Sequence, residues 1–124
     1  MSFTLLVVDD EPEIVKLVTK IFEARGATVL SCSDGQQALD KVPAAMPEIV
    51  LLDIDLPKVD GWEVCKQLKS NELTRRIPIV MMTAAHVTTD EAEKGLGLGA
   101  DDYIQKPFLR EVLVHNIERL LAAR

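Results

Sequence analysis

The stretch IVLLD, residues 49–53, decides the fold, because four apolar residues run without interruption into an aspartate. An uninterrupted apolar run of this length is expected of a strand buried on both faces, as in a parallel sheet covered by helices. Three other strand-like runs end in the same way. Leu5 to Val8 are followed by Asp9 and Asp10, Ile79 to Met82 by Thr83, and Tyr103 to Gln105 by Lys106.

The polar residues at these strand ends form a candidate functional site. The carboxyl ends of parallel strands lie along one edge of a sheet, and open parallel sheets bind their ligands beyond that edge. Carboxylates held close together raise one another's pKa and cost free energy unless a cation offsets them. We therefore expect a function for the group, which comprises Asp9, Asp10, Asp53, Thr83 and Lys106.

Length and composition favour one ordinary domain. The 124 residues, 48% of them hydrophobic, suffice for a single core, so we expect one domain over residues 1–124. The net charge of −6 opposes nucleic acid phosphate and argues against direct nucleic acid binding. Cys32 and Cys65 have neither metal-ligand spacing nor the density of a disulfide scaffold. Because the chain also lacks a signal-peptide pattern and any apolar run near ~20 residues, we expect a soluble cytoplasmic protein outside the membrane.

Helical patterns alternate with the apolar runs, which predicts an α/β fold with helices on both faces of a parallel sheet. A first helix is expected from Pro12, with an apolar stripe to Phe22 and Gly26 as its closing residue. A second strand is expected from Thr28 to Ser31. The fold class therefore follows from the order of the elements alone.

Four further helices are expected, and Asp34 would cap the first of them. The helix after Asp34 is expected to end near Val42, because Pro43 and Pro47 follow it. The next helix is expected from Gly61 to about Ser70, and the fourth from Thr89 or Asp90 to a stretch with Gly95, Gly97 and Gly99. The last helix would bury a stripe of Leu109, Val112, Leu113, Ile117, Leu120 and Leu121.

The three aspartates favour magnesium chemistry on a phosphoryl group. Asp9, Asp10 and Asp53 offer hard oxygen ligands with no histidine or paired cysteine beside them, which favours Mg²⁺ over zinc. Magnesium usually completes its shell with phosphate oxygens, and Thr83 with Lys106 would bind the remaining oxygens of that group. One carboxylate would then be free to attack phosphorus and form an aspartyl phosphate.

Four stretches together resemble the receiver domain of two-component response regulators, a family that includes CheY-like proteins. They are Val8 to Pro12, Leu51 to Pro57 with Asp60 and Gly61, Met82 to Ala84, and Gly99 to Phe108. The resemblance covers the whole chain, and the order and separation of the motifs are more specific than any one of them. It implies a flavodoxin-like (βα)5 fold, with five parallel strands in the order 2-1-3-4-5.

The resemblance also implies a role for each acidic residue. Asp53 matches the phosphoacceptor, and Asp10 matches a direct magnesium ligand. Asp9 matches an acidic partner that acts on the metal mainly through water. The backbone carbonyl of Asp55 matches the position that completes the metal shell.

The remaining matches concern the switch. Thr83 matches the hydroxyl that bonds the phosphoryl oxygen, Lys106 its counter-ion, and Tyr103 the aromatic residue that turns inward when Thr83 moves. Lys106 and Pro107 match a pair that the family usually joins by a cis peptide. The implied protein is a regulator rather than a conventional enzyme.

In the implied cycle, the protein takes a phosphoryl group from a histidine of a sensor kinase or a phosphotransfer protein. The face made by the fourth helix, fifth strand and fifth helix then changes and signals to an effector protein or a fused output domain. Autodephosphorylation by water resets the switch.

Other interpretations stay open beside this one. Asp53 and Asp55 also form the Asp-any-Asp pair of haloacid dehalogenase phosphatases, although that family places its nucleophile early in the chain and its acidic pair late. A nucleotide or flavin binder is disfavoured, because the loop after the first strand is acidic where a phosphate cradle would be glycine-rich. Tyr103 could be a fixed core aromatic, and His86 and His115 are expected at the surface.

Overall fold

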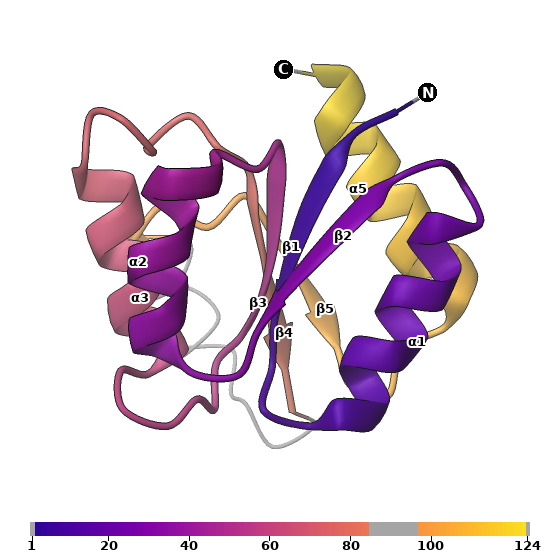
Figure 1. The fold of residues 1–124 in the computed structure, drawn as a ribbon, viewed down its shortest axis with the longest axis horizontal. Coiled ribbons are helices and arrows are strands. Elements are labelled where there is room, and N and C mark those ends of the chain that lie inside the picture. The colour runs from indigo at the N-terminus through magenta and orange to yellow at the C-terminus, as the bar shows by residue number, and fades with distance from the viewer. Residues whose placement is uncertain (1, 85–96, 124) are drawn as a thin grey trace.

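The computed structural model describes residues 2–84 and 97–123, which form a five-stranded parallel sheet with helices on both faces (Figure 1). The strands are β1 (Thr4–Val8), β2 (Thr28–Cys32), β3 (Ile49–Asp53), β4 (Ile79–Thr83) and β5 (Asp102–Gln105). The helices are α1 (Pro12–Glu23), α2 (Gly35–Ala45), α3 (Gly61–Ser70) and α5 (Arg110–Ala123). The strand order β2-β1-β3-β4-β5 confirms the flavodoxin-like arrangement.

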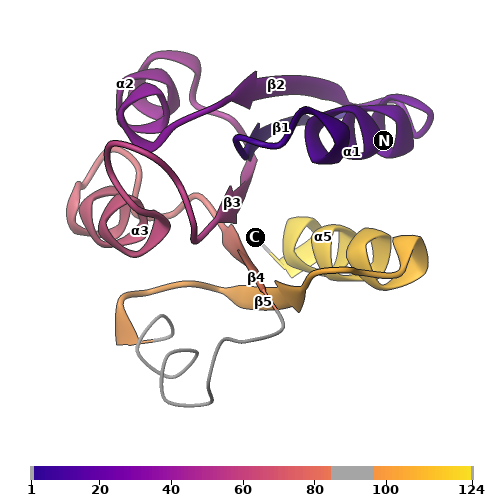
Figure 2. The ribbon, with the colours of Figure 1, turned by 90° about the horizontal axis from the view of Figure 1, so that it is seen from below.

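The two faces of the sheet carry separate hydrophobic clusters, because successive strand residues point to opposite faces. Helices α1 and α5 cover one face, where Leu51 of β3 is fully buried. Helices α2 and α3 cover the other face, where Leu52 is fully buried (Figure 2). Every residue of β3 and β4 is buried, as the uninterrupted apolar runs predict. The carboxyl ends of the two strands are therefore fixed firmly by the core.

One predicted helix end is wrong. Helix α2 continues past Pro43 to Ala45 and stops at Met46, whose φ of 45° is left-handed. A proline this close to the end removes only one hydrogen bond of the final turn, while Val42 is fully buried and its carbonyl accepts the Met46 N–H at 2.8 Å. The left-handed conformation of Met46, whose N–H is bonded to the Val42 carbonyl, therefore ends the helix.

The predicted apolar stripe of the last helix is partly wrong. Leu109 precedes α5 and is 69% exposed, and Val112 is 44% exposed. The buried residues of this helix are Leu113, Val114, Ile117 and Leu121. Apolar residues at neighbouring positions of this helix allow two different apolar stripes at helical spacing. The position of the helix against the sheet decides which of the two is buried.

Other predictions about the helix ends are confirmed. Asp34 caps α2 through a 2.8 Å hydrogen bond from the Gln37 N–H, and Asp60 caps α3 in the same way. Gly26 has the positive φ expected at the end of α1. Within the described residues, no helix has the length and apolar character needed to cross a membrane. The fourth helix predicted from Thr89 or Asp90, with Gly95 and His86, lies outside the described residues.

Candidate functional site

The structure brings the strand ends together at one edge of the sheet, as predicted. Asp9 directly follows β1, and its N–H donates to the Cys32 carbonyl at the end of β2. Asp53 ends β3 and Thr83 ends β4. Lys106 directly follows β5, and its N–H donates to the Thr83 carbonyl at 2.7 Å. Backbone pairing between neighbouring strands therefore sets the position of each of these residues.

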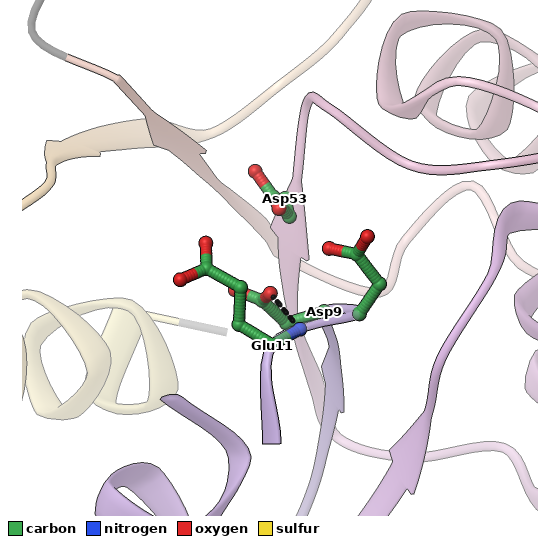
Figure 3. A group of neighbouring side chains, drawn as sticks. Asp9, Glu11 and Asp53 are labelled. Atoms are coloured by element: carbon green, nitrogen blue, oxygen red, sulfur yellow. Dashed lines mark hydrogen bonds between the residues drawn. The ribbon is translucent and has the colours of Figure 1, made fainter. Parts of the chain in front are cut away.

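Four carboxylates meet at this edge. Asp9, Asp10, Glu11 and Asp53 each place a carboxylate oxygen within 4.8 Å of the others. Figure 3 shows that Glu11 lies beside Asp9 after β1, with Asp53 nearby at the end of β3. Asp9 and Asp53 are buried, whereas Asp10 and Glu11 are exposed. All four donors are hard oxygen atoms, so the group fits Mg²⁺ or a similar cation.

Glu11 is the member of this group that the sequence analysis missed. It precedes Pro12, the first residue of α1, and its N–H donates to Asp9 Oδ1 at 2.9 Å. The only signal in the sequence is that Glu11 directly follows two aspartates. Its side chain reaches the site because the chain turns sharply from β1 into α1.

The Lys106 ammonium lies among the carboxylates. Its Nζ is 2.7 Å from Asp9 Oδ2, 3.2 Å from Glu11 Oε1 and 3.3 Å from Asp53 Oδ2. Burial lowers the pKa of Lys106, but the hydrogen bond to Asp9 and the charge of Asp53 outweigh it, so the pKa is raised overall. The ammonium therefore stays charged at neutral pH, and the peptide between Lys106 and Pro107 is cis as expected.

Ionisation of the Asp53 carboxyl group is disfavoured. Burial raises the pKa of Asp53, the charge of Asp9 raises it further, and the pKa reaches about 6. The charge of Lys106 and a 3.3 Å hydrogen bond from the Asp55 N–H lower it again, but by less. At neutral pH the group is mostly ionised and held in a buried position, where an added cation would stabilise it.

The side chain of Asp55 does not join the site. It is exposed, and its carboxylate is not a member of the acidic group found among the described residues. Its backbone N–H is the part that contacts Asp53. The Asp55 carboxylate therefore lies outside the acidic group, and only the backbone of Asp55 takes part in the site.

Thr83 and Tyr103 lie on neighbouring strands. The Thr83 hydroxyl is buried and donates to the Ile104 carbonyl at a long 3.5 Å. The Tyr103 ring is half-buried, and its centroid is 6.4 Å from that of Trp62 at the start of α3. The strand register places Tyr103 opposite Met81, two residues before Thr83. The two predicted switch residues are therefore close along the sheet but turned to different neighbours.

Comparison with known proteins agrees with this geometry. Residues 5–118 match the profile described as the response regulator receiver domain. The chain therefore belongs to the response regulator receiver domain family, whose members are phosphoacceptor regulators of two-component signalling.

Among curated relatives, the alkaline phosphatase synthesis transcriptional regulatory protein PhoP of Bacillus subtilis is 47% identical over 108 residues. That match covers 87% of this chain and 44% of the relative. The DNA-binding response regulator MtrA of Mycolicibacterium smegmatis is 39% identical over 121 residues, which is 98% of this chain and 51% of the relative. The chain thus spans about half the length of these relatives.

Two solved structures share the fold over nearly their whole length. A putative response regulator from Chloroflexus aurantiacus superposes with a TM-score of 0.92 at 31% identity, covering 98% of this chain and 99% of that one. The receiver domain of the sensor histidine kinase PA1611 from Pseudomonas aeruginosa superposes with a TM-score of 0.88 at 29% identity, with the same coverage. That structure is described with a magnesium ion coordinated in its active site cleft.

Proposed function

We propose that this chain is a single receiver domain that accepts a phosphoryl group on Asp53 from a histidine of a sensor kinase or phosphotransfer protein. One observation carries the proposal. Asp53 is a buried carboxylate at the carboxyl end of the central strand, with the Lys106 ammonium 3.3 Å from its Oδ2 atom. This pairing supports the proposal, because Asp53 would attack phosphorus while the Lys106 ammonium would bind a phosphoryl oxygen.

Magnesium is the expected cofactor, because the donor set consists of carboxylate oxygens. The side chains of Asp10 and Asp53 and the backbone carbonyl of Asp55 would hold it, with Asp9 acting mainly through water. When bound, the cation neutralises charge on the carboxylates and on the phosphoryl oxygens. The raised pKa of Asp53 supports this role, since burial and the neighbouring charge of Asp9 leave its carboxylate in need of a cation.

The transfer itself needs little from the protein except position. An oxygen of Asp53 attacks phosphorus, the phosphorus–nitrogen bond of the donor histidine breaks, and the imidazole leaves with the bonding electron pair. Lys106 stays protonated and binds a phosphoryl oxygen, for which it gives up part of its contact with Asp53. In the reset reaction a water attacks phosphorus and the bond between phosphorus and the Asp53 oxygen breaks. Inorganic phosphate departs, and Asp53 is again a free carboxylate.

The signal would leave through Thr83 and Tyr103. A phosphoryl group adds nearly two negative charges beside the Thr83 hydroxyl, whose present bond to Ile104 is long and easily exchanged. Movement of Thr83 would open space for Tyr103 to turn inward from its position against Trp62. The face that includes β5 and α5 would then report phosphorylation to an effector protein or an attached output domain.

The test is incubation with a small phosphodonor and Mg²⁺, followed by intact mass measurement. We expect the native chain to gain one phosphoryl group, and Asp53→Asn to gain none. Omission of Mg²⁺ should abolish the gain. Equal phosphorylation of the native chain and Asp53→Asn would contradict the proposal.

Asp55→Asn separates a receiver from a phosphatase. A haloacid dehalogenase enzyme would turn over phosphomonoesters many times and would lose that activity in Asp55→Asn. We expect no such turnover and a normal phosphoryl gain in this variant, because the Asp55 carboxylate is exposed and only its backbone contacts Asp53.

A further inference from the structure

The loop between β3 and α3, residues 54–60, carries the Asp55 carbonyl and is held tightly against the rest of the molecule. Ile54 and Leu56 are buried, and the Val59 N–H donates to the Pro57 carbonyl at 2.9 Å. Lys58 has a left-handed φ of 69°. A residue other than glycine in this conformation needs support from its surroundings.

One support comes from Gly61, the first residue of α3. Its N–H donates to the Ile54 carbonyl at 2.8 Å. A Cβ atom on Gly61 would overlap the Asp53 carbonyl oxygen and lie 2.7 Å from Ile54 Cα. The absence of a side chain here lets α3 begin directly against the backbone of the phosphoacceptor.

A second support comes from α2, a helix that contributes nothing to the acidic group. Its first residue, Gly35, donates its N–H to the Pro57 carbonyl at 3.3 Å. A Cβ atom on Gly35 would overlap the Val59 carbonyl oxygen and lie 2.9 Å from Val59 Cβ. The neighbouring Asp34 carboxylate adds a weaker contact, 3.7 Å from the exposed Lys58 ammonium.

Helix α2 is the fixed partner in this contact and the loop is the part that yields. Ala38 and Val42 of α2 are fully buried against the sheet, so the helix cannot retreat without opening the core. A side chain on Gly35 would instead displace the stretch around Val59. Because that stretch is only a few residues from Asp55, its displacement would move the carbonyl that is proposed to complete the metal shell.

We infer that Gly35 is a positioning residue for the magnesium site, acting through the backbone of residues 57–59. The inference rests on the proposed function, because it concerns the cation assigned there to Asp10, Asp53 and the Asp55 carbonyl. Residues that orient metal ligands from outside typically change metal affinity about 10- to 100-fold when they are altered. Gly35→Ala should therefore weaken the Mg²⁺ affinity by about tenfold or more.

The affinity is measured by calorimetric titration of folded protein with Mg²⁺. Gly97→Ala is the matched control, because a Cβ atom on Gly97 meets nothing within 4 Å. Ile117→Val controls for lost stability, since Ile117 is buried on the opposite face of the sheet. Both controls should keep the Mg²⁺ affinity of the native chain. A native-like affinity in Gly35→Ala would overturn the inference.

Amide hydrogen exchange on the native chain tests the contact between Gly35 and the Pro57 carbonyl without any variant. It therefore still tests the inference if Gly35→Ala does not fold. Mg²⁺ should slow hydrogen exchange of the Gly35 N–H, because its acceptor, the Pro57 carbonyl, belongs to the loop. Exchange of the Ala38 N–H should stay unchanged, because its acceptor is the Asp34 carbonyl at the start of the same helix. Protection of Asp55 with no change at Gly35 would overturn the inference alone. Absence of any Mg²⁺ binding by the native chain would overturn the proposed metal site and this inference together.

Discussion

The raised pKa of Asp53 links the site to the stability of the fold. The folded protein holds a proton on Asp53 up to about pH 6, whereas the unfolded chain releases it near 3.8. Between these values the folded state binds more protons than the unfolded state, so the free energy of unfolding falls as the pH rises. The native chain without Mg²⁺ therefore carries a stability cost from Asp53 that is present above pH 6 and absent below about pH 4.

Asp53→Asn should remove this cost. We expect the variant to be more stable than the native chain by about 1–3 kcal/mol near pH 7.5, and the difference to shrink as the pH falls toward 4. Urea unfolding in the presence of a chelator measures it. Asp55→Asn, the same change at an exposed position, should alter the unfolding free energy by less than about 0.5 kcal/mol. If Asp53→Asn changed the free energy of unfolding equally near pH 7.5 and near pH 4, the raised pKa of Asp53 would be contradicted.

Glu11 competes with Asp53 for the Lys106 ammonium. In Glu11→Gln the ammonium should turn more fully to Asp53 and to an incoming phosphoryl group, and one repulsive charge disappears. We expect phosphorylation by a small donor at saturating Mg²⁺ to speed up by at most about fivefold, the range of an exposed ion pair. Glu13→Gln, a neighbouring exposed acid on α1, should leave the rate unchanged. A slower rate in Glu11→Gln would show that Glu11 serves the metal instead.

At the scale of elements, the strands were predictable and some helix details were not. Uninterrupted apolar runs have no competing helical period, so β3 and its terminal Asp53 follow from local sequence. Helix α2 ends at the left-handed Met46 rather than before Pro43, and Glu11 meets Lys106 across 95 residues of chain. A local sequence pattern does not predict contacts between residues that are far apart in the chain. For the same reason, the sequence did not indicate that Gly35 contacts the loop before α3.

The contact between α3 and β5 offers a reporter of the switch. Trp62 is the only tryptophan in the chain, and its ring is tilted at 56° to that of Tyr103. If phosphorylation turns Tyr103 inward, Trp62 fluorescence should change in intensity and wavelength. Thr83→Val, which keeps the shape but lacks the hydroxyl, should be phosphorylated without this change, whereas Thr83→Ser should retain it. Constant fluorescence in fully phosphorylated native protein would contradict the coupling.

At the scale of the whole molecule, Mg²⁺ should stabilise the fold, since only the folded chain brings the acidic residues together. At a free Mg²⁺ concentration about tenfold above Kd, the free energy of unfolding should rise by about 1.4 kcal/mol. Asp10→Asn should lose most of this increase, measured by urea unfolding with and without the cation. An equal rise in Asp10→Asn would point to binding elsewhere on the acidic surface.

The two ends of the chain have a practical consequence. β1 begins at Thr4 and delivers Asp9 to the site at its far end, and α5 returns to the starting end, where both termini lie in Figure 1. A tether or dye attached at either terminus would therefore stand a full strand length from the carboxylates. The protein could be anchored to a sensor surface by its terminus with the edge that carries Asp53 facing the solution, so phosphodonors would reach that edge unhindered.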